Sequence, residues 1–299
     1  MNTILCSCVL DGITVERVVR NEVLVMPDMH IHPEYEIYYM FNGERYYFIE
    51  DKTYRIRKGT LVLIDSMYIH KTSELGKDFH DRFLIELNLE PFSTFFQSIT
   101  GMGLAEFFSR YSCVLELDEQ TQEWIELRFN DIMEESERKL DNYNILIMLK
   151  ITEILLLVSR LHSERLIPSN LSMSNKTKHQ MINEIAAYIT QGDVRVKTLD
   201  DICHRFFISK SYLCRIFKEV TSFTIQDYVN INCVKRAQKL LEDNDLTVAE
   251  ISEKLGYNSA TYFARVFKKY TETTPLKYRK KQHIIKQKVR NRLPDSQGE

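Results

Sequence analysis

A ten-residue basic pattern occurs twice in the C-terminal part of this chain, with starting points fifty residues apart. Residues 212–221 and 262–271 each begin with tyrosine, carry arginine at the fourth position and continue with a Phe-Lys pair. Duplex DNA repeats about every 34 Å, so two basic helices of this kind on one rigid body could enter successive major grooves. The repeat therefore predicts a duplicated helical unit with a positively charged face.

A second helix is predicted before each copy, because each copy is preceded by a capping-box pattern. These patterns are Thr198-x-x-Asp201 and Thr247-x-x-Glu250, whose side chains satisfy free N–H groups at a helix start. Gly256 suits a left-handed turn in the second unit. Two helix-turn-helix units are therefore expected. Their packing faces are predicted from apolar residues at three- and four-residue spacing: Leu199, Ile202, Phe206, Leu213, Ile216 and Phe217, then Val248, Ile251, Leu255, Phe263, Val266 and Phe267.

Arg215 and Arg265 hold the same outward position in the two units. Arginine in such a helix can pair with guanine O6 and N7, whereas lysines further along more often hold phosphates. The alternative is that both arginines are surface charges or intramolecular ion-pair partners, and the repetition favours DNA binding. The predicted DNA-binding residues are Ser209, Lys210, Ser211, Cys214, Arg215 and Lys218 in the first unit and Asn258, Ser259, Ala260, Thr261, Arg265 and Lys268 in the second.

The formal net charge of −2 hides two halves of opposite sign. From residue 176 onward the chain has 23 Lys and Arg against 14 Asp and Glu, a formal charge of +9, whereas residues 1–175 carry −11. A basic half can release counterions from a duplex and bind it in a salt-dependent way. The acidic half is a poor surface for DNA and is expected to have another role.

The segment from about residue 182 to residue 279 resembles the AraC-type transcriptional regulators. The matching elements, in the order of the family, are Leu199-Asp-Asp-Ile202, Ser209-x-x-Tyr-Leu-x-Arg-x-Phe-Lys218, Leu255-Gly-Tyr257, Tyr262-Phe-x-Arg-x-Phe-Lys268 and Thr274-Pro275-x-x-Tyr-Arg279. The resemblance implies an all-α domain of two helix-turn-helix units joined by a linker helix. It also implies a double-stranded DNA operator as partner, with RNA polymerase as a further partner of an activator.

Three positions depart from the family pattern. Ser222 and Glu272 stand where the family usually has a helix-terminating glycine, so we expect a strained or lengthened turn at each. Cys233 stands where the linker helix usually carries an arginine, and its presence is expected to remove a backbone contact or salt bridge. None of the three changes the repeated arginines.

The linker helix is also predicted from its own periodicity. Its apolar residues lie mostly on one stripe, and no glycine or proline interrupts them. Such a helix would fix the distance between the two units. The stripe consists of Ile225, Tyr228, Val229, Val234, Ala237, Leu240 and Leu241.

The first ninety residues have the pattern of a small β-barrel or jelly roll. Runs rich in Tyr, Ile, Val and Phe alternate with turn residues. The clearest pair is 35–41 and 46–50 around a predicted Asn42-Gly43 hairpin turn, and strands at 54–57, 60–64 and 83–89 follow.

His30-x-His32-x-x-x-Glu36, with Gly43 and the later His70, resembles the two cupin motifs, and AraC-type regulators often carry such a barrel as their sensor. Residues 30, 32 and 36 share parity, so one strand would direct all three into the barrel, where His70 could join them. Pro33 confines this stretch to a strand start or edge. The predicted ligand-binding residues are His30, His32, Glu36, Tyr38 and His70.

Three interpretations of this cluster remain open. It could hold a transition metal such as Fe, Mn, Ni or Zn, line an organic-ligand pocket, or serve a purely structural purpose. The family resemblance favours a metal-free pocket, so no metal or cofactor is assigned, and a sugar is the first expectation for the ligand.

Helices are expected at 91–110, 120–139 and 143–162. The last is apolar on more than one side, which exceeds what packing on a barrel requires. Burial against a second copy would explain this, and the family commonly dimerises here, so Leu149 and Leu156 are predicted dimerisation residues; a core helix in a monomer is the alternative. Lys150 and Glu153 interrupt the run and argue against a membrane span.

Four segments follow from these patterns. They are a cupin-like sensing and dimerisation domain at 1–165, a linker at 166–180, a double helix-turn-helix DNA-binding domain at 181–283 and a basic flexible tail at 284–299. The six cysteines form no metal-type pair of pairs and residues 4–10 do not resemble a signal peptide, so a cytoplasmic protein is expected.

The expected function is a DNA-binding transcriptional regulator modulated by a small molecule in the barrel. The alternatives are a metal-dependent cupin enzyme fused to a DNA-binding module and an architectural DNA binder without a sensor, for which the barrel would be superfluous. We find no further catalytic constellation, no phosphate-binding glycine loop and no nucleophile with a signature. The chain is therefore predicted not to be an enzyme.

Overall fold

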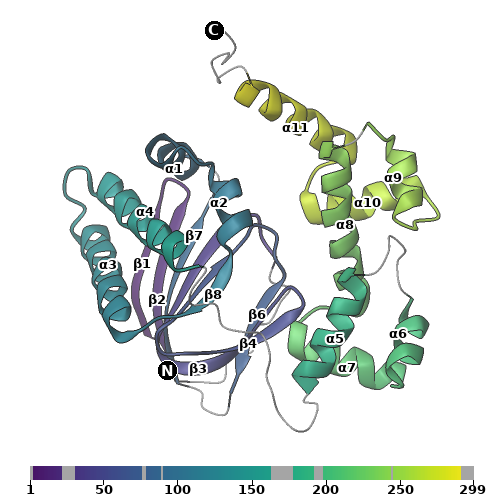
Figure 1. The fold of residues 1–299 in the computed structure, drawn as a ribbon, viewed down its shortest axis with the longest axis horizontal. Coiled ribbons are helices and arrows are strands. Elements are labelled where there is room, and N and C mark those ends of the chain that lie inside the picture. The colour runs from purple at the N-terminus through teal and green to yellow at the C-terminus, as the bar shows by residue number, and fades with distance from the viewer. Residues whose placement is uncertain are drawn as a thin grey trace. The chain divides into compact units, whose positions relative to one another are not determined.

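The computed structural model describes residues 3–21, 31–75, 79–88, 90–162, 178–191, 198–243 and 245–290. These form two compact units that divide near residue 180. The first is built on a β-sheet with helices against it and the second is entirely helical (Figure 1). This architecture confirms the predicted fold class.

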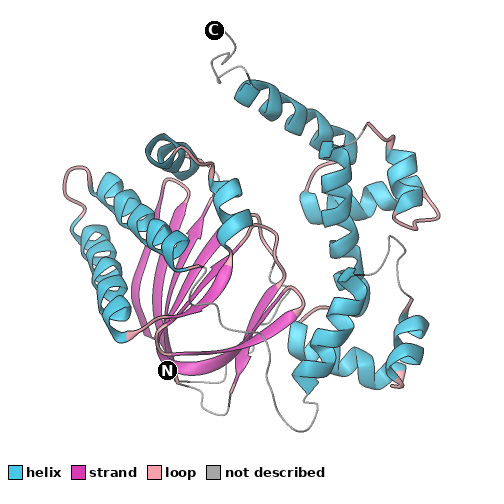
Figure 2. Ribbon diagram, viewed as in Figure 1, coloured by secondary structure: helices cyan, strands magenta, loops and turns pink. Residues whose placement is uncertain are grey.

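The first unit contains eight strands, all in antiparallel pairs (Figure 2). Its strands are β1 Thr3–Leu10, β2 Ile13–Arg20, β3 Tyr35–Ile49, β4 Lys52–Arg57, β5 Thr60–Ile64, β6 His70–Glu74, β7 His80–Leu87 and β8 Cys113–Glu116. The main order is β1-β2-β7-β3-β5-β8, while β4 and β6 pair with the second half of β3. The long strand β3 is therefore shared by two sheets.

The predicted hairpin turn at Asn42-Gly43 is wrong, because β3 runs without a turn from Tyr35 to Ile49. The register with β7 shifts between Met40 and Asn42, where β3 passes from one sheet to the other. Gly43 has φ +93°, and a Cβ there would lie 2.5 Å from the Phe79 carbonyl oxygen. The glycine thus allows a close approach of the neighbouring backbone within a bent strand, rather than a chain reversal.

The two faces of the sheet have different neighbours. Residues such as Tyr39, Phe83 and Ile85 pack with the helices, and the Phe83 and Phe129 rings stack with centroids 4.4 Å apart. Residues of the opposite parity face the barrel interior, where they form a second core. This interior core comprises Tyr38, Met40, Tyr47, Ile56, Val62, Ile64 and Val114, with Leu84 packed against it.

Four helices complete the first unit: α1 Phe92–Thr100, α2 Leu104–Tyr111, α3 Glu119–Arg138 and α4 Tyr143–Leu161. The helices expected at 120–139 and 143–162 are confirmed, whereas the single helix expected at 91–110 is two helices. Gly101 ends α1 with φ +73°, a left-handed value that breaks the helix.

The second unit consists of α5 Lys178–Gln191, α6 Leu199–Phe206, α7 Lys210–Thr221, α8 Ile225–Asp243, α9 Val248–Lys254, α10 Ala260–Thr271 and α11 Pro275–Arg290. Both predicted capping boxes are present, with each threonine accepting an N–H and each acidic side chain bonding back to the threonine N–H. The two predicted helix pairs are thus α6 with α7 and α9 with α10.

Helix α8 is the predicted linker helix, and most of its apolar stripe is buried. Its N-terminal Asp227 accepts a hydrogen bond of 2.7 Å from the Tyr270 hydroxyl and lies 3.0 Å from Lys269 Nζ of α10. Near its C-terminus, Glu242 accepts a hydrogen bond of 2.5 Å from the Tyr278 hydroxyl of α11. Both ends of α8 are therefore fixed to the second helix-turn-helix unit and the helix that follows it.

The two residues that stand where the family usually has glycine adopt the left-handed conformation that glycine favours. Ser222 and Glu272 have φ values of 66° and 59°, which are left-handed and strained for residues with a Cβ. Cys233 is buried, beside Tyr257 of the turn between α9 and α10.

The segment predicted as a flexible tail from residue 284 begins instead as helix, because α11 continues to Arg290. No glycine or proline occurs between Pro275 and Pro294, and lysine, glutamine and arginine are good helix formers. Residues 291–299 and most of the linker at 166–180 lie outside the described residues. Among the helices that are described, none is both long and apolar enough to cross a lipid bilayer.

Candidate DNA-binding surface and ligand-binding interior

The two recognition helices, α7 and α10, are built in the same way. Ser209 and Ser259 precede them, and each serine Oγ accepts the N–H of the tyrosine three residues on, at 3.3 Å in both cases. The predicted packing residues Leu213, Phe217, Phe263 and Phe267 are buried. Burial of this stripe leaves the opposite face of each helix to solvent.

All twelve predicted DNA-binding residues lie on that solvent side. Ala260 is partly exposed and the other eleven are exposed. Within the described part of the chain, neither Arg215 nor Arg265 forms an ion pair with a carboxylate. This argues against the alternative of intramolecular ion-pair partners and leaves both guanidinium groups available to a ligand.

Each of these arginines lies over an exposed tyrosine. The guanidinium carbon of Arg215 is 5.4 Å from the ring centroid of Tyr212, and that of Arg265 is 5.2 Å from the ring centroid of Tyr262. Contact with an aromatic ring restrains a long arginine side chain and so prepares it for binding. The predicted DNA-binding residues do not include these tyrosines, and their place at the start of each repeat is the sequence signal for this role.

Lys210 differs from Arg215 and Arg265 because it already has a carboxylate partner. Its Nζ lies 2.6 Å from Asp200 Oδ1 of α6, and this hydrogen bond raises the pKa of Lys210. Both side chains are exposed, so the pair is weak and a phosphate could replace the carboxylate.

In the barrel, Glu36 of β3 gathers the polar groups of the predicted ligand site. Its Oε2 lies 3.1 Å from His70 Nε2 and 3.4 Å from His32 Nε2, and its Oε1 accepts a hydrogen bond of 2.8 Å from the Tyr47 hydroxyl. His32 precedes β3 rather than lying on it, so the shared-strand argument fails for this residue. His30 lies outside the described residues.

The charges of this group are mutually dependent. Burial alone would raise the pKa of Glu36, but the charge and hydrogen bonds of His70 and His32 outweigh it and hold that pKa well below its ordinary value. Burial alone would lower the pKa of His32, but the hydrogen bond and charge of Glu36 raise it. The group therefore favours an ionised carboxylate beside a protonated His32.

Tyr38 lies in the same interior. Its side chain is buried, and its ring centroid is 5.2 Å from that of Tyr47. Burial raises the pKa of Tyr38 to about 12, so the hydroxyl stays protonated and can donate a hydrogen bond.

His32, Glu36 and His70 also have the composition of a metal site. One ligand atom from each can be chosen so that all lie within 4.8 Å of one another. Two imidazoles and a carboxylate are a ligand set that zinc, iron or manganese accepts. The residues therefore fit a metal, and they equally fit an organic ligand with hydroxyl groups.

The predicted dimerisation residues lie on the outer side of α4. Leu149 and Leu156 are each 38% exposed, and Ile145 and Leu146 are exposed beside them.

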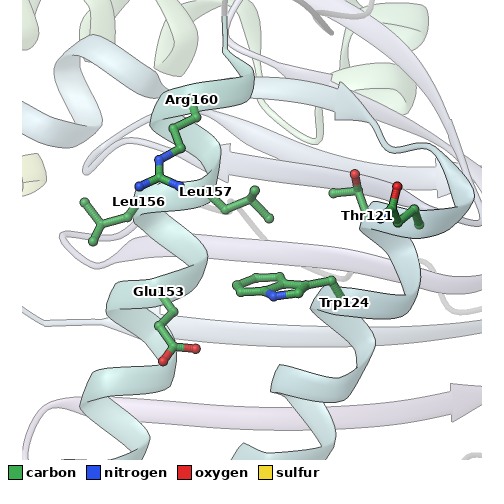
Figure 3. A pocket seen from close by; sticks show the side chains of 7 residues that line it. Thr121, Trp124, Glu153, Leu156, Leu157 and Arg160 are labelled. Carbon is green, nitrogen blue, oxygen red and sulfur yellow. The ribbon is translucent and has the colours of Figure 1, made fainter.

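A pocket of about 410 Å³ lies between α3 and α4 and includes Trp124 and Leu156 (Figure 3). The remaining lining residues are Gln120, Thr121, Glu153, Leu157 and Arg160.

Both units match known domain families. Residues 20–138 match the AraC-like ligand binding domain, and residues 202–281 match a helix-turn-helix domain. The chain belongs to the AraC-type transcriptional regulators. Its matched regions are the sheet unit that contains Glu36 and the helical unit that contains α7 and α10.

Individual relatives match different lengths of the chain. The Msm operon regulatory protein of Streptococcus mutans is 33% identical over 38% of this chain and 40% of its own length. The melibiose operon regulatory protein of Escherichia coli is 22% identical over 86% of this chain and 84% of its own length. Among solved structures, ToxT of Vibrio cholerae is 12% identical, with 90% of this chain and 97% of that chain covered and a TM-score of 0.38.

Proposed function

We propose that this protein is a sequence-specific DNA-binding transcriptional regulator whose activity is modulated by a small molecule in the N-terminal barrel. The observation that carries the proposal is the matched pair of recognition helices. Each presents an exposed, tyrosine-backed arginine without a carboxylate partner in the described part of the chain. Such arginines suit bidentate recognition of guanine, while Lys218 and Lys268 further along suit phosphates.

The DNA-binding part of the proposal is tested by the salt dependence of binding to an operator selected from random DNA. Full-length protein should bind this operator far more tightly than unrelated duplex. Lys218→Ala should weaken both and lower the slope of log affinity against log salt by about one unit, because one phosphate contact is lost. Equal affinity of the unchanged protein for selected and unrelated DNA would overturn the proposal.

The effector is proposed to bind among His32, Glu36, Tyr38 and His70. All four side chains converge on the barrel interior, and the carboxylate with its histidines is suited to hydrogen-bonding a hydroxylated molecule. One relative is named as the regulatory protein of the melibiose operon, and this name supports a sugar or sugar-like molecule as the effector. We propose His30 for the same site because the His30-x-His32 spacing follows the cupin pattern.

The effector site is tested by Glu36→Gln in a reporter strain that responds to an inducing metabolite. The variant should lose the response while its basal affinity for operator DNA stays within twofold of the unchanged protein. A variant with a full response would place the effector elsewhere.

The protein is further proposed to act as a cytoplasmic homodimer through α4, with RNA polymerase as a partner if it activates transcription. A soluble effector and a DNA operator both fit that location. The exposed leucines of α4 support the dimer, because an apolar stripe of this kind is usually covered.

The second candidate is a metal-dependent cupin enzyme, which the convergence of His32, Glu36 and His70 favours. Metal analysis of the purified full-length protein separates the two functions. Stoichiometric metal whose removal leaves DNA binding and the effector response intact would support the enzyme. Binding of the effector to metal-free protein would support the regulator.

A further inference from the structure

A second polar group lies in the barrel interior, and it is basic. Strands β2, β7 and β3 are neighbours, and their registers place Arg20 opposite His80 and Val18 opposite Arg82. Arg82 shares parity with Leu84, which faces the interior, so Arg82 is directed to the same side. Arg20 and Arg82 are diagonal neighbours on that face, a separation that long side chains easily span.

Burial removes these cations from water. Arg82 is 8% exposed and Arg20 is partly exposed, while Arg45 of β3 is buried with its Nη1 atom 2.9 Å from His80 Nδ1. Burial, followed by the charges of Arg82 and Arg45, lowers the pKa of Arg20, and Glu16 opposes this shift. The guanidinium groups are thus close enough to repel one another.

Several hydrogen-bond donors of this group remain to be satisfied. Arg82 Nη2 lies 3.1 Å from Glu16 Oε1. By contrast, Arg20 Nε, Arg82 Nη1 and the Tyr38 hydroxyl are shielded from solvent and have no hydrogen-bond partner among the described residues. Buried donors are normally paired, and a buried cation is stable only with an anion beside it. Three unsatisfied donors on one interior face, two of them cationic, call for an acceptor that carries negative charge.

Tyr38 connects this basic group with the histidine group. Burial raises the pKa of Tyr38. The positive charges of Arg82 and Arg45 oppose this shift and the negative charge of Glu36 adds to it, so both groups act on the Tyr38 hydroxyl. The interior therefore has a basic side and a side built around Glu36, with a tyrosine hydroxyl between them.

We infer that the effector carries an oxyanion, a carboxylate or a phosphate, which Arg20, Arg82 and Tyr38 bind while its hydroxyl groups meet Glu36 and the histidines. This inference rests on the proposed effector site in the barrel and names the chemical class of its ligand. Guanidinium groups bind carboxylate and phosphate through paired N–H donors, which suits both anions. A neutral sugar would leave Glu16 as the one carboxylate named beside these two cations, and it would bring no negative charge to the buried Arg20 Nε and Arg82 Nη1 donors.

The first test uses inorganic phosphate with the full-length protein at constant ionic strength, with chloride as the reference anion. Phosphate should raise the melting temperature of the N-terminal unit above its value in chloride. Arg20→Gln and Arg82→Gln should remove this increment, because each removes a cationic donor. The matched control Arg55→Gln, which changes an exposed arginine paired with Glu44 on the barrel surface, should keep it.

Arg20→Gln also shows whether a lost phosphate increment reflects a lost anion site or a destabilised fold. Because it relieves repulsion, this variant should melt in chloride at or above the temperature of the unchanged protein. If Arg82→Gln does not fold, Arg20→Gln alone decides the matter. Absence of a phosphate increment in the unchanged protein, or an increment that survives in Arg20→Gln, would overturn the inference.

Glucose, glucose 6-phosphate and glucuronate then distinguish the two anions by isothermal titration. At least one of the two charged sugars should bind more than tenfold more tightly than glucose, and the tighter one identifies the anion. Glucose binding as tightly as both would overturn the inference. The regulator function would survive that result if operator binding is intact, so the two failures are distinguishable.

Discussion

Phe207 occupies the turn position of the first helix-turn-helix unit that Gly256 occupies in the second. Both are left-handed, with φ values of 55° and 80°. The phenylalanine side chain is 94% exposed, so it gains almost nothing from packing. A residue with a Cβ is strained in this conformation, whereas glycine is not.

Phe207→Gly is therefore expected to stabilise the second unit by about 0.5–1 kcal/mol, the relief of strain less the added freedom of the unfolded chain. Urea unfolding followed by circular dichroism measures it. The converse change, Gly256→Ala, should destabilise by a similar amount. A loss of stability in Phe207→Gly would show that the exposed ring has contacts in solution.

His32 and Glu36 make the stability of the first unit depend on pH. The lowered pKa of Glu36 stabilises the fold above the unfolded carboxyl pKa of about 4.3, and that contribution is lost as pH falls through the folded value. The raised pKa of His32 stabilises the fold below the unfolded imidazole pKa of about 6.5, and that contribution is lost as pH rises through the folded value.

The melting temperature of the first unit should thus be highest between about pH 4.5 and 6.5 and fall above that range as His32 loses its proton. His32→Gln should flatten the fall on the alkaline side, and the exposed His204→Gln in the other unit should not. A scan of melting temperature against pH decides this, and an unchanged alkaline slope in His32→Gln would contradict it.

At the scale of elements, α8 matters because Asp227 joins its N-terminus to the end of α10. Asp227 accepts hydrogen bonds from Tyr270, at 2.7 Å, and from Lys269, at 3.0 Å. Asp227→Ala should lower the free energy of unfolding of the second unit by about 1–2 kcal/mol, since the Tyr270 hydroxyl loses its acceptor. Exposed Glu253→Ala is the control, and equal effects of the two changes in chemical denaturation would rule out a specific joint.

Helices and caps were predictable because their signals are local. Thr198, Thr247 and the apolar stripe of α8 contain the information for their own structure. The path of β3 was not predictable, because Asn42-Gly43 is also a hairpin signal and only the approach of β7 distinguishes the two. Arg20 and Arg82 become neighbours only through the pairing of β2 with β7, which sequence periodicity does not specify.

At the scale of the whole molecule, the outer side of α4 bears on assembly. Leu149→Glu combined with Leu156→Glu should convert the proposed dimer into a monomer, because two charges would be buried in an apolar contact. Sedimentation velocity measures the change, with Ile99→Glu, also an exposed apolar residue of the first unit, as the control. A double variant that still sediments as a dimer would remove α4 from the interface.

Selection of binding sites from random DNA tests whether α7 and α10 are two DNA-reading helices held by α8. Full-length protein should select a site with two blocks of base preference about one helical turn, or 10 base pairs, apart. Arg215→Ala should erase preference in one block and Arg265→Ala in the other, each at a cost of about 1–3 kcal/mol. Both variants selecting the unchanged site, or losing affinity equally for all sequences, would contradict the claim.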